Sequence, residues 1–138
     1  MACSYVIDKE HRLVISTGVG FVTFDEMKAH QTRLFNDPDF NPEYNQLMDA
    51  TAIERVALSR GAAEILTSRN IFSPNSRRAL VANKPAIFGM GRLLMTYFDM
   101  TQGASQTNVF WELAPALKWL GLEGLAIHEK AESAKTGT

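Results

Sequence analysis

Apolar and polar residues alternate in two N-terminal segments, 4–8 and 13–17, separated by a charged run at residues 9–12. A period of two with β-branched and aromatic residues is typical of strands, so the pattern predicts a β-hairpin. The apolar face expected to be shared by its two strands consists of Tyr5, Ile7, Leu13 and Ile15.

Gly18 and Gly20 interrupt the apolar run that follows the hairpin, which predicts a bulge or a sharp bend before the first helix. Thr23 and Glu26 have the spacing of a capping box, in which a hydroxyl and a carboxylate each bond a backbone N–H at a helix start. The sequence therefore predicts a helix that begins after Thr23 and ends before Pro38.

Strand and helix patterns alternate along the rest of the chain, while residues 51–58 have no decisive pattern. The further elements expected are an inner strand at 44–49, a helix capped by Ser59, a buried strand at 79–82, a helix from 83–85 to before Gln102, a strand at 107–111 and a helix at 112–120. An N-terminal hairpin followed by alternating helices and strands indicates an α/β fold, with a mixed β-sheet backed by helices.

The length of 138 residues, with 46% hydrophobic and 21% charged residues, is typical of one globular domain. We expect this domain to span residues 1–122 and a frayed polar tail to span 123–138. Lys and Arg (14) nearly balance Asp and Glu (15), so no global field attracts nucleic acid or an anionic membrane.

Cys3 is the single cysteine, which excludes an intramolecular disulfide and favours a reducing cytoplasm. The N-terminus lacks an export-signal pattern. Glycines and charged residues interrupt the longest apolar stretch, at residues 87–100, so no transmembrane segment is expected.

Catalytic and metal-binding patterns are missing from the sequence. His11, His30 and His128 have no partner at ligand spacing, so neither a metal site nor a cofactor is predicted. No serine lies in a nucleophile-elbow motif, and nothing in the sequence activates Cys3. We therefore expect no enzymatic activity; the scattered residues that an enzyme would have to use are Asp49, Glu54 and His30.

Residues 70–100 have a local excess of positive charge, with four basic residues against Asp99 alone. One interpretation is an anion or phosphate site that uses guanidinium groups and the free amides of a helix start. The residues proposed for it are Ser76, Arg77, Arg78 and Arg92. In the competing interpretation, Arg77 and Arg78 flank a strand and point to opposite faces, and Gly89 and Gly91 allow close packing of a helix on the sheet.

The same part of the chain is rich in methionine and aromatic residues, which adapt to variable apolar ligands. The residues proposed to line an apolar pocket are Phe88, Met90, Met95, Phe98 and Trp111. In the competing interpretation these side chains belong to an ordinary core.

Several short segments together carry a resemblance to a known family. They are Tyr5-x-Ile7-Asp8, Leu34-Phe35-Asn36-Asp37-Pro38-x-Phe40, Gln46-Leu47-x-Asp49, Phe72-Ser73-Pro74-x-Ser76-Arg77-Arg78-Ala79 and Trp119-Leu120-Gly121. Over about residues 4–122 the chain resembles the bacterial SpoIIAA-like, STAS-related proteins, small domains of mostly unknown function. The resemblance implies a mixed sheet backed by helices. One branch of that family consists of anti-anti-sigma factors, and a CRAL-TRIO-like branch implies apolar ligands instead.

In the anti-anti-sigma branch a serine at the start of the second helix is phosphorylated. The matching segment here is 58–61, in which Ser59 falls on the phosphoacceptor, Gly61 on the motif glycine, and Leu58 on an acidic position. The resemblance thus implies Ser59 as a candidate phosphoacceptor. The competing interpretation is a plain helix N-cap.

We interpret the chain as a non-enzymatic cytoplasmic regulatory or protein-interaction domain whose surface around the second helix meets a partner protein. The alternative is a carrier or sensor of a small apolar or anionic ligand, with a pocket near the helix at residues 86–100. Exposed sheet edges or that same helix also make a homodimer plausible.

Overall fold

The computed structural model describes residues 2–102 and 106–127. The elements in chain order are β1 (Cys3–Asp8), β2 (Leu13–Thr23), α1 (Phe24–Phe35), β3 (Asn45–Ala57), α2 (Arg60–Ser68), β4 (Arg78–Val81), α3 (Pro85–Gln102), β5 (Thr107–Phe110) and α4 (Leu113–Trp119). Within these residues the strands form one five-stranded sheet in the order β1-β2-β3-β4-β5. β1 pairs antiparallel with β2, and the other pairs are parallel. The predicted α/β class with a mixed sheet is confirmed.

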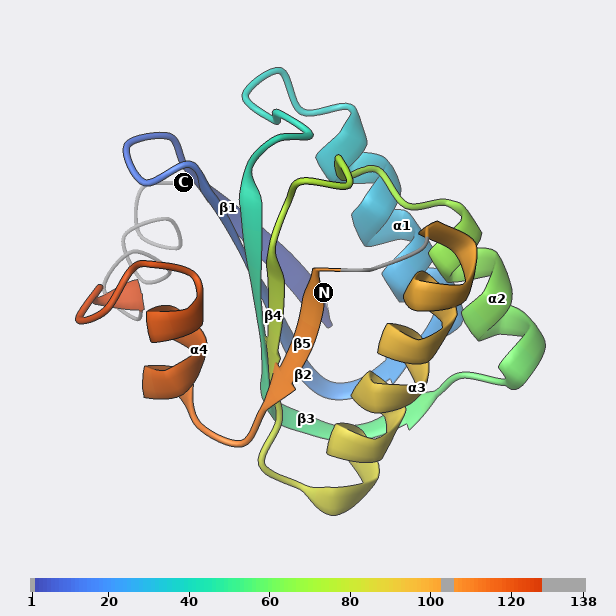
Figure 1. Cartoon of the computed structure of the whole chain (residues 1–138). Coiled ribbons are helices and arrows are strands. Elements are labelled where there is room, and N and C mark those ends of the chain that lie inside the picture. Colours follow the sequence, from blue (N-terminus) through green and yellow to red (C-terminus); the bar gives the residue numbers. More distant parts are fainter. Residues whose placement is uncertain (1, 103–105, 128–138) are drawn as a thin grey trace.

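The helices cover the two faces of the sheet unequally. Among the helices of the described residues, α1, α2 and α3 lie on one face, and α4 lies on the other (Figure 1). No helix in the described ranges is both long and apolar enough to cross a membrane.

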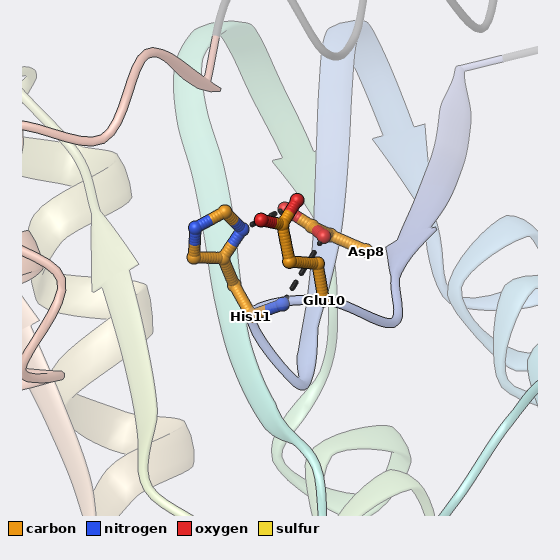
Figure 2. Close-up of side chains that lie close together, drawn as sticks. All are labelled: Asp8, Glu10 and His11. Atoms are coloured by element: carbon orange, nitrogen blue, oxygen red, sulfur yellow. Dashed lines mark hydrogen bonds and ion pairs between the residues drawn. The ribbon is translucent and has the colours of Figure 1, made fainter.

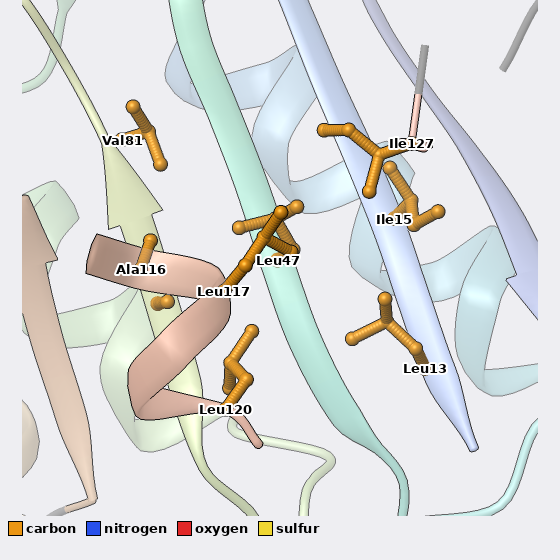
Figure 3. Packing of buried hydrophobic residues seen from close by; sticks show 9 residues of the cluster. Leu13, Ile15, Leu47, Val81, Ala116, Leu117, Leu120 and Ile127 are labelled. Carbon is orange, nitrogen blue, oxygen red and sulfur yellow. The ribbon is translucent and has the colours of Figure 1, made fainter. Parts of the chain in front are cut away.

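The face under α4 is closely packed. Leu47 on the central strand meets Leu117 of α4 in a cluster that extends to Ile127 (Figure 3). The buried members of this cluster are Leu13, Ile15, Leu47, Ala79, Val81, Ala116, Leu117, Leu120 and Ile127. Ile127 belongs to the expected tail, of which residues 128–138 lie outside the described part of the chain.

The hairpin forms as predicted, but its expected shared face is wrong. Ile7 pairs with Val14, and Asp8 pairs with Leu13. Directly paired residues point to the same face, and successive residues alternate, so Tyr5 and Ile7 face the side opposite Leu13. The number of residues in the connecting loop decides which residues of β1 and β2 point to the same face. The alternation of apolar and polar residues within each strand does not reveal that number.

β2 and β3 extend well beyond the rest of the sheet. β4 pairs only with residues 46–49 of β3, whereas β2 pairs with β3 as far as Ala57. Residues 51–58, which carried no decisive pattern, therefore mostly form strand. The far part of β3 curves beneath α3 (Figure 1).

Two bulges produce this curvature at the predicted glycines. The register shifts between Thr17 and Val19 and again between Gly20 and Phe21, and each shift adds one residue on the β3 side. Such bulges bend a strand and increase its twist. A Cβ at Gly18 would lie 2.6 Å from Ile53 Cδ1, so a larger residue at this position would force the Ile53 side chain to shift.

Side-chain caps start α1 and α2 as expected. Thr23 Oγ1 accepts from the Glu26 N–H at 3.3 Å, and Ser59 Oγ accepts from the Ala62 N–H at 3.1 Å. The return bond predicted from the Glu26 carboxylate to Thr23 does not form, and Glu26 Oε2 is buried without a hydrogen-bond partner. The capping box of α1 is therefore only half made.

The two glycines of α3 differ in their surroundings, and this difference is testable. A Cβ at Gly91 would lie 2.3 Å from Leu80 Cδ2, whereas a Cβ at Gly89 meets nothing within 4 Å. Gly89→Ala should raise the free energy of unfolding by about 0.5–1 kcal/mol, because alanine is the better helix former. Gly91→Ala should lack most of this gain, because the end of the Leu80 side chain must move away from the new methyl group. Urea unfolding of both variants checks this, and equal effects would contradict the close approach of α3.

Candidate functional site

A cavity lies between the sheet and the three helices on its open face. Its volume is about 180 Å³, and its lining includes residues of β2, β3, β4, α1, α2 and α3. Most of the wall is apolar; examples from different elements are Val22, Ile53, Leu34, Leu66, Ile87 and Leu94. The curved ends of β2 and β3 contribute Val22 and Ile53, so the two bulges help to close the cavity.

A short row of polar side chains crosses the sheet side of this cavity. Arg78 on β4 pairs in register with Gln46 on β3. Gln46 Nε2 donates to Ser16 Oγ on β2 at 3.0 Å. All three residues are buried and line the cavity.

Arg78 is the cationic member of this row and is only 5% exposed. Its Nη1 donates to Asn70 Oδ1 at 2.7 Å. The guanidinium lies 4.2 Å from the ring centroid of Phe98 and 5.5 Å from that of Phe72. Its Nε is buried and has no hydrogen-bond partner. Burial lowers the pKa of Arg78 to about 10, so the side chain stays charged at neutral pH.

His30 of α1 also lines the cavity and is 9% exposed. Its ring meets the edge of Tyr5 at 5.6 Å between centroids, and its Nε2 is buried without a hydrogen-bond partner. Burial, together with the charge of Arg33, lowers the pKa of His30 to about 4. The imidazole is therefore neutral at pH 7.

The four residues proposed as an anion site are not brought together. Ser76 is buried, and its hydroxyl donates to the Tyr44 carbonyl at 2.7 Å. Arg77 is exposed and donates to the Trp119 carbonyl at 2.8 Å, on the α4 side. Arg78 points to the opposite face, into the cavity, and Arg92 is exposed on α3. This arrangement agrees with the competing interpretation for Arg77 and Arg78 as neighbours on a strand.

The five residues proposed for an apolar pocket are divided between two places. Met90 and Phe98 line the cavity, whereas Phe88, Met95 and Trp111 do not. Phe88 and Trp111 stack on each other with centroids 4.5 Å apart, and Trp111 is 48% exposed. The period of α3 places its residues on different sides, which accounts for the division.

The scattered enzyme candidates do not form a catalytic group in the described part of the chain. His30 and Asp49 both border the cavity, but Glu54 is exposed and does not. Asp49 Oδ1 accepts from the N–H and the hydroxyl of Thr51, at 3.0 and 2.6 Å. Burial and the Glu26 carboxylate raise the pKa of Cys3, which disfavours its reactive thiolate.

The β1–β2 loop groups three side chains whose proximity the sequence pattern missed. Asp8, Glu10 and His11 place ligand-type atoms within 4.8 Å of one another (Figure 2). Asp8 also accepts from the His11 N–H at 3.2 Å, and its other oxygen lies 2.8 Å from His11 Nδ1. These contacts close the turn, in which Arg12 adopts a left-handed conformation with φ of 53°.

Sequence reasoning also missed Ser16, Gln46 and His30 as cavity residues. Ser16 and Gln46 are polar residues at inward positions of strands, and His30 lies on the buried side of α1. A buried polar residue in an apolar stretch is the signal that could have found them.

Ser59 is exposed at the N-terminus of α2, where its hydroxyl caps the helix. Ser59→Ala should lower the free energy of unfolding by about 1 kcal/mol, because the Ala62 N–H loses its acceptor. Ser59→Asp should keep stability within about 0.5 kcal/mol of the parent, since aspartate also caps helices. Urea denaturation measures both, and an equal loss in the two variants would show that the hydroxyl acts otherwise than as a cap.

Burial of His30 predicts a pH-dependent stability. The pKa is about 4 in the folded protein against 6.5 for the free side chain, so the unfolded chain binds the proton more tightly. The contribution of neutral His30 to the free energy of unfolding is present above pH 6.5 and is lost as the pH falls toward 4. Between pH 7 and 4.5 the parent should lose about 2–3 kcal/mol more than His30→Gln, which does not titrate. Denaturant unfolding of the parent and the variant at both pH values measures the difference. An equal loss of unfolding free energy in the two proteins would contradict a neutral buried histidine.

Comparison with known protein-family models found no match, and no curated protein matches the sequence. Among solved structures, the chain is similar to an uncharacterized protein of the DUF3478 family, with a SpoIIAA-like fold, from Shewanella loihica PV-4. The identity is 17%, the TM-score is 0.59, and the match covers 86% of this chain and 94% of that one. Together with the mixed sheet and its alternating helices, this similarity shows that the chain has a SpoIIAA-like fold.

Proposed function

We propose that the protein is a non-enzymatic carrier or sensor that binds a small, largely apolar molecule in the cavity beneath α3. The observation that carries this proposal is the apolar space of about 180 Å³ between the sheet and three helices. Protein interiors are packed as closely as organic crystals and rarely leave voids larger than a water molecule. Apolar surface that lines such a space is not covered by other protein atoms and therefore contributes less to stability than closely packed core does. An apolar ligand that fills the space would cover this surface.

The volume limits the size of the ligand. An apolar cavity of roughly 150 Å³ holds a benzene molecule, so the space here suits about six to ten non-hydrogen atoms. The lining methionines Met27, Met48 and Met90 have flexible thioether side chains that adapt to ligand shape.

The titratable groups near the cavity support binding rather than catalysis. His30 is neutral with a pKa of about 4, too low for an efficient general base at neutral pH. Asp49 is committed to hydrogen bonds with Thr51.

Methyl-¹³C-methionine NMR tests the proposal with an internal control. Titration with indole or hexan-1-ol should shift the methyl signals of Met27, Met48 and Met90, which line the cavity. Met100 is 73% exposed and should not respond. Ala50→Leu fills part of the cavity and should weaken binding at least tenfold, whereas Ala114→Leu, exposed on α4, should not.

The contrary result of this titration is equally clear. Binding is disproved if no lining methionine shifts with either probe, or if Ala50→Leu binds as well as the parent protein.

A protein-interaction role around α2 is the second candidate. It is supported by the side chain of Ile65, which is 50% exposed on α2, the helix capped by the exposed Ser59. Affinity capture from the native host would test it, with Ile65→Glu as the control. A stoichiometric partner retained only by the parent chain supports this role, and an identical set of captured proteins counts against it.

A further inference from the structure

We propose that the ligand of the cavity is a small monoanionic amphiphile, whose carboxylate binds the buried guanidinium of Arg78 while its apolar part lies beneath α3. The inference rests on the ligand-binding function proposed above and names the chemical class of the ligand. It is carried by one buried cation in a wall whose surface is otherwise mostly apolar.

Burial of a charge requires compensation. Arg78 is 5% exposed, and a buried ion is normally paired or fully hydrogen-bonded. The amide oxygen of Asn70 and the rings of Phe72 and Phe98 supply part of this compensation. Arg78 Nε, however, is buried and has no acceptor. One donor of a side chain that borders the cavity is thus left without a partner.

No carboxylate in the described ranges neutralises this cation. No ion pair of Arg78 is found there, and among the described residues that line the cavity only Asp49 is acidic. Asp49 and Leu47 are two residues apart on β3, so their side chains point to the same face of the sheet. Leu47 packs against α4, and the Asp49 side chain therefore lies on the face away from the cavity. Asp49 also accepts two bonds from Thr51. Among the described residues, no carboxylate therefore balances the charge of Arg78.

The unpartnered Nε indicates a planar anion. An arginine presents Nε and one terminal nitrogen as parallel donors, which match the two oxygens of a carboxylate. A single cation balances one negative charge, which favours a monoanion over a doubly charged phosphate. Gln46 is the register neighbour of Arg78, and Ser16, which accepts from Gln46, keeps its own hydroxyl proton as a donor.

The apolar part of the cavity limits the size and shape of the apolar part of the ligand. Beyond the polar row, apolar side chains of α1, α2 and α3 face the space, among them Leu34, Leu66 and Leu94. The volume of about 180 Å³ accommodates a carboxylate with a short alkyl chain or one aromatic ring. Hexanoate, with eight non-hydrogen atoms, is a suitable probe.

Hexanoate and hexanamide form a matched pair for the test, because they share shape and chain length and differ in charge. In the parent protein at pH 7, hexanoate should bind at least tenfold more tightly than hexanamide. Only hexanoate should also shift the ¹H–¹⁵N signal of Arg78 Nε. Arg78→Met should abolish the preference. Arg77→Met should keep it, because Arg77 lies on the other face against Trp119.

Each outcome has a distinct meaning. Equal affinity of the two probes in the parent protein overturns the anion site but leaves the ligand-binding function intact. Failure of both probes to bind overturns the anion site, and the titration with indole and hexan-1-ol then decides the ligand-binding function. A preference that survives in Arg78→Met also overturns the assignment. If Arg78→Met does not fold, the comparison of the two probes in the parent protein still decides.

Discussion

The long parallel pairing of β2 with β3 is the constraint on which the rest of the structure depends. This pairing runs from Leu13 and Asn45 to Thr23 and Ala57, far beyond the four residues that β4 contributes. Because two bulges bend the extended part, the far part of β3 curves beneath α3 (Figure 1). The helices of this face then surround a curved surface, and the space between them is not completely filled.

The two faces of the sheet consequently have different physical roles. On the α4 face, leucine, isoleucine, valine and alanine side chains from strands and helix form a close-packed cluster that includes Ile127. On the opposite face, buried residues divide into two smaller clusters with the cavity among them. A closely packed face stabilises the sheet, and this allows the other face to hold a polar row and an open volume.

Arg78 shows that the position of an arginine along a strand decides whether its side chain is exposed or buried. Its neighbour Arg77 differs by one position, is exposed and contacts Trp119, whereas Arg78 is buried between Phe72 and Phe98. Successive residues of a strand point to opposite faces, so one of these two arginines lies in water and the other in the protein interior. The low dielectric around Arg78 makes each of its remaining interactions stronger and each missing one more costly.

The sequence by itself determined the order of elements, the helix caps at Thr23 and Ser59, and the bend at Gly18 and Gly20, because these depend on local patterns and backbone preferences. It also identified Arg78, Met90 and Phe98, but not as neighbours of Ser16, Gln46 and His30. Only the tertiary structure decided that grouping, the parity of the hairpin and the existence of the cavity. Strand register and helix packing bring together residues far apart in the chain, and no local pattern encodes the space left between them.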